Sequence, residues 1–268
     1  MIDHDRGVVL RGIKLRETSK ILSVLGSAHG RLRLVAHGGR GTGHRFGSSL
    51  EVGNEIEFVF SQRPGSELGT LREATLRRSW LAGGRKLENL GAGLAALELL
   101  ERVVPEGAAE PGLLEDTFGV LAALQVAGDR ATSLLAFYMF ELRLLGRLGL
   151  QPDLGACARC GAVPQDGAVL DVVAGALFCR ECGPAGRRRL LLPQEAAAVL
   201  ARLARCDWSD LESIETQART RRAVGLAVHR LLSVHLDRYR YPRSLQLLKN
   251  VDKRPAPPSD PESVTESS

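Results

Sequence analysis

The stretch Arg31-Leu32-Arg33-Leu34 alternates basic and apolar residues, and Ile13-Lys14-Leu15-Arg16 does the same. Asn54-Glu55-Ile56-Glu57-Phe58-Val59-Phe60 repeats the alternation with acids in place of the cations. A period of two is typical of a strand with one face toward a core, so we expect the apolar side chains inside and the charged ones outside. A weaker fifth strand is predicted from Leu68 to Leu76, after the turn at Arg63-Pro64-Gly65-Ser66. Five strands without an intervening helical window predict a small barrel such as an OB-fold.

The same N-terminal segment is strongly basic. Nine cations and the single acid Glu17 lie between positions 6 and 45, a net charge of +8, whereas the whole chain of 268 residues carries +5. The cations are Arg6, Arg11, Lys14, Arg16, Lys20, Arg31, Arg33, Arg40 and Arg45. This charge favours a nucleic-acid partner, which OB-folds often bind as a single strand. The alternative is a solvated basic face on an ordinary β domain, because charge alone is a weak indicator.

A glycine-rich loop at residues 38–47 carries two arginines and a histidine and could follow a phosphate backbone. It does not match a P-loop, because no Lys-Ser or Lys-Thr follows its last glycine. Phe58 and Phe60 share the inward phase of Ile56, which leaves Phe46 as the one plausible base-stacking residue in the first 79 positions. We therefore expect electrostatic attraction to outweigh stacking in any nucleic-acid complex.

From about Gly83 the apolar period changes from two to about 3.6, which predicts a helical domain. The predicted helices cover residues 87–100, 113–126, 134–148, 193–204 and 217–236. The last of them carries Arg219, Arg221, Arg222 and Arg230, and Arg187-Arg188-Arg189 precedes the fourth. These arginines either extend a DNA-binding surface or are simply solvated, as charges on exposed helices commonly are.

Four of the five cysteines form two tight pairs, Cys157-x-x-Cys160 and Cys179-x-x-Cys182, with eighteen residues between them. This spacing predicts a structural zinc site, because each pair brings two thiolates together from one turn and Zn²⁺ takes four soft donors. Gly161 and Gly183 follow the pairs, where a tight turn favours a residue that can adopt positive φ. The alternatives are two local disulfides or a redox motif, and the latter needs only one pair. We expect one Zn²⁺ in a module at residues 155–185.

The remaining features concern location and the end of the chain. No charged and apolar leader is present, and the longest apolar run, Leu134 to Phe140, is far shorter than the roughly 18 residues of a membrane span. We therefore expect a cytoplasmic protein without membrane contact. Residues 251–268 are rich in proline, serine and acids and are predicted to be disordered.

Several stretches, in their order along the chain, resemble the bacterial recombination mediator family RecO. They are Glu17-Thr18-Ser19-Lys20-Ile21-Leu22-Ser23-Val24-Leu25 before His29-Gly30-Arg31-Leu32, then Val35-Ala36-His37-Gly38-Gly39-Arg40, and Phe140-Glu141-Leu142-Arg143-Leu144-Leu145-Gly146-Arg147-Leu148-Gly149-Leu150-Gln151-Pro152 before Cys157-Ala158-Arg159-Cys160-Gly161. The resemblance as a whole covers most of positions 7 to 250.

The resemblance implies an OB-fold at residues 1–79, a helical domain at 80–250 with the zinc module inserted, and no catalytic centre. RecO-like proteins bind single- and double-stranded DNA, anneal complementary strands, associate with RecR and the single-strand binding protein, and help to load RecA. The family's DNA surface is made by basic residues of the OB-fold. The matching positions here are Arg11, Lys14, Arg16, Lys20, Arg31, Arg33, Arg40 and Arg45.

Three other functions compete with this one. A zinc-dependent hydrolase or nuclease needs an open metal position or a carboxylate cluster, and four cysteines leave neither. A zinc-containing OB-fold protein that binds RNA or acts in transcription is the main alternative, since OB-folds also accept RNA. A scaffold without nucleic-acid contact is the third, and it makes the basic segment dispensable.

Overall fold

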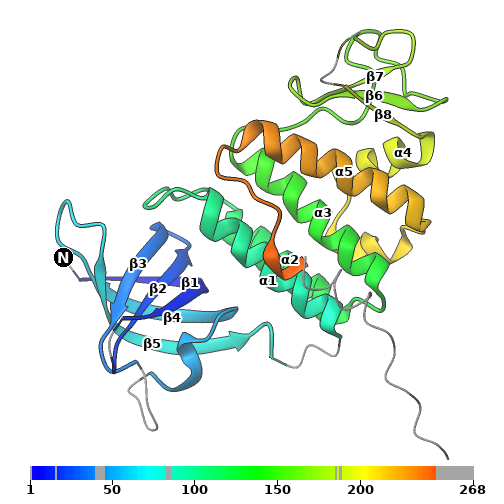
Figure 1. Cartoon of the computed structure of the whole chain (residues 1–268). Helices are drawn as coiled ribbons and strands as arrows, with labels where there is room; N and C mark the ends of the chain where they lie inside the picture. The colour runs from blue at the N-terminus through cyan, green and yellow to red at the C-terminus, as the bar shows by residue number, and fades with distance from the viewer. Residues whose placement is uncertain are drawn as a thin grey trace, which may run out of the picture.

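The computed structural model describes residues 2–15, 17–39, 46–82, 86–184, 186 and 189–245, and it shows a barrel followed by a bundle of helices (Figure 1). The predicted α+β class is thereby confirmed. The barrel strands are β1 (Ile2–Lys14), β2 (Lys20–Gly26), β3 (Gly30–Ala36), β4 (Asn54–Ser61) and β5 (Gly69–Ser79), with a short 3-10 helix η1 (Gly47–Leu50) before β4. The predicted disordered segment, residues 251–268, lies outside the described residues.

The barrel closes in the order β1-β2-β3-β5-β4, with β4 pairing back onto β1. All its pairings are antiparallel except β3 with β5, where Leu34 lies opposite Gly69. This is an OB-like topology, which agrees with the small five-stranded barrel predicted from the sequence. Its core consists of inward side chains from every strand and includes Ile56, Phe58 and Phe60, each at most 2 % exposed.

The inward phase predicted for Leu32 and Leu34 is confirmed, since both lie in the barrel core. The same prediction for Ile13 and Leu15 is wrong, because their side chains are 45 % and 44 % exposed. A bulge in β1 between Val9 and Arg11 shifts the alternation there by one residue. Ile13 therefore points outward on the same strand whose Val9 points into the core.

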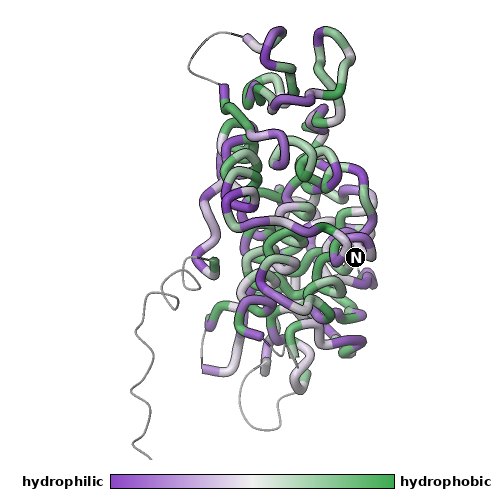
Figure 2. Tube along the Cα trace, turned by 90° about the vertical axis from the view of Figure 1, so that its right-hand side faces the viewer, coloured by the Kyte–Doolittle hydropathy of each residue, from purple (hydrophilic) through white to green (hydrophobic). Residues whose placement is uncertain are grey.

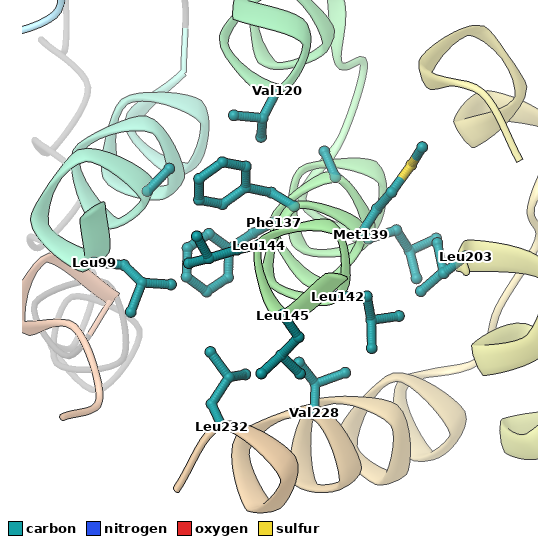
Figure 3. Close-up of a cluster of buried hydrophobic side chains, with 14 of the residues drawn as sticks. Leu99, Val120, Phe137, Met139, Leu142, Leu144, Leu145, Leu203, Val228 and Leu232 are labelled. Atoms are coloured by element: carbon teal, nitrogen blue, oxygen red, sulfur yellow. The ribbon is translucent and has the colours of Figure 1, made fainter. Parts of the chain in front are cut away.

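The helical part follows the predicted pattern closely. Its helices are α1 (Leu87–Val103), α2 (Leu113–Val126), α3 (Arg130–Arg147), α4 (Gln194–Leu203) and α5 (Ala218–His235), with the 3-10 helix η2 (Trp208–Ser213) between the last two. Figure 3 shows how α3 occupies the centre: Phe137, Met139 and Leu145 contact side chains from the surrounding helices. The large apolar residues of α3 point in several directions, because helices lie on more than one side of it.

A third element is a three-stranded antiparallel sheet inserted between α3 and α4. It consists of β6 (Ala168–Asp171), β7 (Ala176–Cys179) and β8 (Arg189–Leu192), with β6 in the centre. The sheet lies beyond α5, at the end of the molecule away from the barrel, and the side view shows it at the same end (Figures 1 and 2). These strands were not predicted, because each is only four residues long.

The barrel and the helical bundle are joined through the outer face of β1, β2 and β3. Val8, Leu25 and Arg31 lie side by side across these strands. Val8 and Leu25 belong to the hydrophobic core of the helices, not to that of the barrel. Arg31 is 6 % exposed; its Nε donates to the carbonyl of Val104 at 2.7 Å, just after α1.

Two carboxylates complete the surroundings of this buried cation. The guanidinium nitrogens of Arg31 lie 3.7 Å from Glu101 and 3.3 Å from Glu106. The amide of Gly107 also donates to the carbonyl of Arg31. This hydrogen bond joins the chain after α1 to the edge of β3. No helix in the described part of the chain is both long and apolar enough to cross a membrane.

We expect Arg31→Ala to lower the free energy of unfolding by about 2–3 kcal/mol, because it leaves the buried Oε2 atom of Glu101 without its cation. Denaturant unfolding of the purified protein measures this change. Arg33→Ala is the matched control: the same strand and face, but a side chain 40 % exposed, so a loss below about 1 kcal/mol is expected. Equal losses in the two variants would contradict the structural role of Arg31.

Candidate metal centre and nucleic-acid interface

The structure brings together the four cysteines predicted to hold zinc. The Sγ atoms of Cys157, Cys160, Cys179 and Cys182 all lie within 4.8 Å of one another, and Cys160 and Cys179 are 4.0 Å apart. A tetrahedron with metal–sulfur bonds of about 2.3 Å has edges of about 3.8 Å, so the cluster is sized for one ion. The cysteines are free thiols without a disulfide, which argues against two local disulfides. The cluster therefore fits a metal with a preference for four sulfur ligands.

Two tight turns place the sulfurs. The amide of Gly161 donates to the carbonyl of Cys157 at 2.8 Å, and the amide of Gly183 donates to that of Cys179 at 2.9 Å. Gly161 has φ of 73°, as predicted for a residue that closes such a turn. Gly183 is not among the residues of positive φ, so the prediction is wrong there. It is needed for space instead, because a Cβ on Gly183 would lie 2.6 Å from the Val169 side chain.

The pKa values of Cys157 and Cys182 are shifted in opposite directions. The backbone amide of Cys160 lowers the pKa of Cys157 to about 6, so this sulfur is a thiolate at neutral pH. A hydrogen bond with Cys179 raises the pKa of Cys182 to about 12. One sulfur is thus ready to bind a cation while another must release its proton on binding, so acid is expected to weaken metal affinity.

The module shares its core with the helices. Leu170, Leu177 and Leu192 of the small sheet belong to the same hydrophobic cluster as α3 and α5. His235, the last residue of α5, places its Nε2 3.0 Å from the carbonyl of Val172 in the turn between β6 and β7. The metal ligands therefore hold a sheet whose apolar side chains support the helical bundle.

The basic residues predicted to bind DNA divide into four groups, of which Arg31 alone forms the last. Arg11 and Lys14 are exposed on β1 and have no ion pair among the residues that the structure describes. Lys20 and Arg33 are partly exposed and lie near acids, Lys20 at 3.1 Å from Glu51 and Arg33 at 3.8 Å from Glu106. Arg16, Arg40 and Arg45 lie outside the described residues.

Arg31 differs from the other predicted contacts. Its charge is buried at the junction with the helices and lies between two carboxylates. A guanidinium in this position cannot reach a DNA phosphate without separating the barrel from α1, so it is not part of the proposed surface.

The expectation that Phe46 stacks on bases is wrong. Its ring is 6 % exposed and belongs to the barrel core. No aromatic residue of the barrel that the structure describes offers an exposed ring, since Phe58 and Phe60 are also buried and Trp80 is 7 % exposed. Any nucleic-acid contact of the described barrel therefore depends on cations, polar groups and aliphatic side chains.

Sequence reasoning missed the cations of β5, Arg72, Arg77 and Arg78, which are exposed. Each has a protein partner: Arg72 contacts Ser61, Arg77 pairs with Glu57, and Arg78 lies 3.8 Å from the ring centre of Trp80. The weak alternation from Leu68 to Leu76 hid their outward placement, because both faces of β5 are exposed in its second half.

The helical arginines are arranged differently. Arg219 lies 3.5 Å from Glu195, and Arg221 donates to the carbonyl of Thr216. Arg221 and Arg222 line a pocket of about 700 Å³ between α3, α5 and the segment that follows α5, together with Tyr138 and Tyr239. Arg187 and Arg188 lie outside the described residues. Two of the four arginines of α5 thus border a concave, partly apolar surface.

Together these features define a class of protein: an OB-like barrel with unpaired surface cations, fused to a helical domain that carries a four-cysteine metal centre. Comparison with known families gives the particular one. The model for "Recombination protein O N terminal" matches residues 1–80, and that for "Recombination protein O C terminal" matches residues 84–245. The chain belongs to the recombination protein O (RecO) family, whose members are recombination mediators and not enzymes.

Similar proteins agree with this assignment over nearly their full length. The DNA repair protein RecO of Frankia casuarinae is 34 % identical over 236 residues, 88 % of this chain and 94 % of that protein. The proteins of the same name from Anaeromyxobacter dehalogenans and Streptomyces griseus are each 31 % identical, over 87 % and 93 % of this chain and 91 % and 98 % of their own length.

We expect the double variant Cys157→Ser, Cys160→Ser to lose its bound metal and to melt at least about 5 °C lower, because the cluster holds a sheet that shares the helical core. Metal analysis and thermal unfolding measure the two effects. Cys206→Ala is the matched control, since this fifth cysteine lies outside the cluster and contacts Met139. An unchanged melting temperature in the double variant would show that the metal does not support the fold.

Proposed function

We propose that this protein is a DNA repair and homologous recombination mediator that binds single- and double-stranded DNA through its barrel and anneals complementary strands. The observation that carries the proposal is the pair of exposed cations Arg11 and Lys14 on the barrel of a RecO-family chain. Neither has an ion pair in the described part of the chain, so their charges are available to phosphates.

The mechanism is physical, without bond making or breaking. Cations on the barrel neutralise phosphates on two strands at once and lower their mutual repulsion, so that complementary bases can pair. Contacts with phosphates carry little sequence information, so binding is largely independent of sequence. The buried aromatic rings agree with this mechanism, because they leave electrostatic attraction as the main source of affinity.

The partners follow from the family. We propose that the protein associates with RecR and the single-strand binding protein in the cytoplasm. With RecR, it helps to load RecA onto strands coated by the single-strand binding protein. The helical domain is the proposed docking region for the single-strand binding protein. The pocket bordered by Arg221, Arg222 and Tyr239 supports this choice, since it offers a concave and partly apolar surface.

We also propose that the four cysteines bind one Zn²⁺. Four thiol ligands at tetrahedral spacing suit this ion and leave no open position for a substrate. When bound, the ion supplies a crosslink between the two turns and takes no part in DNA chemistry. Its role is to hold the small sheet against α5.

Annealing of two labelled complementary oligonucleotides, without ATP and at two salt concentrations, tests the proposed function. We expect acceleration that falls as salt rises. In the variant Arg11→Ala, Lys14→Ala we expect about tenfold weaker binding to unrelated sequences alike. The slope of the logarithm of the binding constant against the logarithm of the salt concentration should become shallower by about 0.7 to 1 for each cation removed.

Arg219→Ala with Arg230→Ala is the matched control, because it removes two exposed cations from α5, neither of which lines the proposed docking pocket, and leaves the barrel intact. We expect it to bind DNA as the unmodified protein does. No DNA binding by the unmodified protein at low salt would overturn the proposal and favour a protein-binding scaffold.

A further inference from the structure

Ser23 in the middle of β2 has a buried hydroxyl group without a hydrogen-bond partner among the described residues. The residue is 5 % exposed, and its Oγ atom is one of two such side-chain atoms in that part of the chain. A buried polar group left unpaired costs free energy and is uncommon in folded proteins. It therefore requires an explanation beyond the fold.

The register of the strands shows what surrounds this hydroxyl. Leu22 and Val24, on either side of Ser23, point into the barrel core, so Ser23 points outward. Arg11 on β1 and Arg33 on β3 lie directly opposite Ser23 on its two sides. The hydroxyl thus lies in a row between two arginines, one without an ion pair in the described chain and one 3.8 Å from Glu106.

The next row on the same face is apolar. Ile13, Ile21 and Val35 lie side by side across the three strands. Ile13 is 45 % exposed, and Leu15, just after the end of β1, is 44 % exposed. A large aliphatic side chain exposed next to cations suits a ligand with an anionic group beside an apolar one.

A single DNA strand has that composition, with a phosphate next to each sugar and base. We propose that Arg11, Ser23 and Arg33 bind one phosphate of the strand while Ile13 and Ile21 contact the neighbouring sugar and base. The inference rests on the proposed function and adds to it a hydroxyl donor and an apolar contact. The hydroxyl is buried in the unbound chain, so the proposed binding includes a movement of the long Arg11 and Arg33 side chains, which flank Ser23, that exposes it to the phosphate.

The test compares binding of a thymidine oligonucleotide with that of an abasic strand of equal length. We expect Ser23→Ala to weaken binding to both by about 3- to 10-fold, since the phosphate is common to them. The salt dependence stays unchanged because a hydroxyl carries no charge. The melting temperature stays equal or rises, because the variant removes an unpaired buried polar atom.

Ile13→Thr is expected to weaken binding to the thymidine strand and to leave binding to the abasic strand unchanged. Ser233→Ala on α5, away from the barrel, is the control for serine removal and is expected to have no effect. Unchanged affinity in Ser23→Ala, or lower affinity together with a lower melting temperature, would overturn the inference.

The same measurements separate this inference from the proposed function. If the unmodified protein binds DNA and Arg11→Ala weakens binding while Ser23→Ala does not, only the role of Ser23 is refuted. If the unmodified protein binds neither strand, the proposed function fails and this inference fails with it.

Discussion

The buried guanidinium of Arg31 holds the two halves of this protein in one arrangement. It lies at the end of the β1–β2–β3 outer face, where Val8 and Leu25 enter the helical core, and it contacts the chain on both sides of the end of α1 through Val104 and Glu101. A buried cation with two carboxylates is costly to expose, because separation would leave charges without partners. The barrel surface that faces solvent is therefore fixed by what the helices cover.

Burial by the helices changes from row to row across the outer face of β1, β2 and β3. The row nearest the helices, with Arg31, is buried; the next has exposed or partly exposed arginines on either side of the buried Ser23; and in the third Ile13 is exposed whereas Val35 is buried. One strand thus supplies an arginine to the interior and, two residues later, another to the surface. Arg31 forms a structural ion pair whereas the charge of Arg33 can reach a phosphate, although both are arginines on the same face of β3.

The four-cysteine cluster lies in a separate part of the fold. Its four sulfurs come from two turns that are defined locally, each closed by an amide-to-carbonyl hydrogen bond. The sheet between them is made of strands of four residues, too short to be stable alone. Packing against the helices compensates for this, because apolar residues of the sheet belong to the same core as α3 and α5.

The sequence by itself determined the β class of the first 79 residues, the strands β3, β4 and β5, the helices and the cysteine cluster, because each depends on a short-range pattern: alternation, a 3.6-residue period, or paired cysteines. It also placed Leu32 and Phe58 in the core correctly. It did not show β2, and it marked only the end of β1. Only the tertiary structure decided the fates of Arg31, Phe46 and Ile13. The first is covered by a helix more than fifty residues away in sequence, the second completes the barrel core from a loop, and the third is turned outward by a bulge. Local pattern sets which face of a strand a side chain occupies, but what covers that face depends on residues distant in the chain.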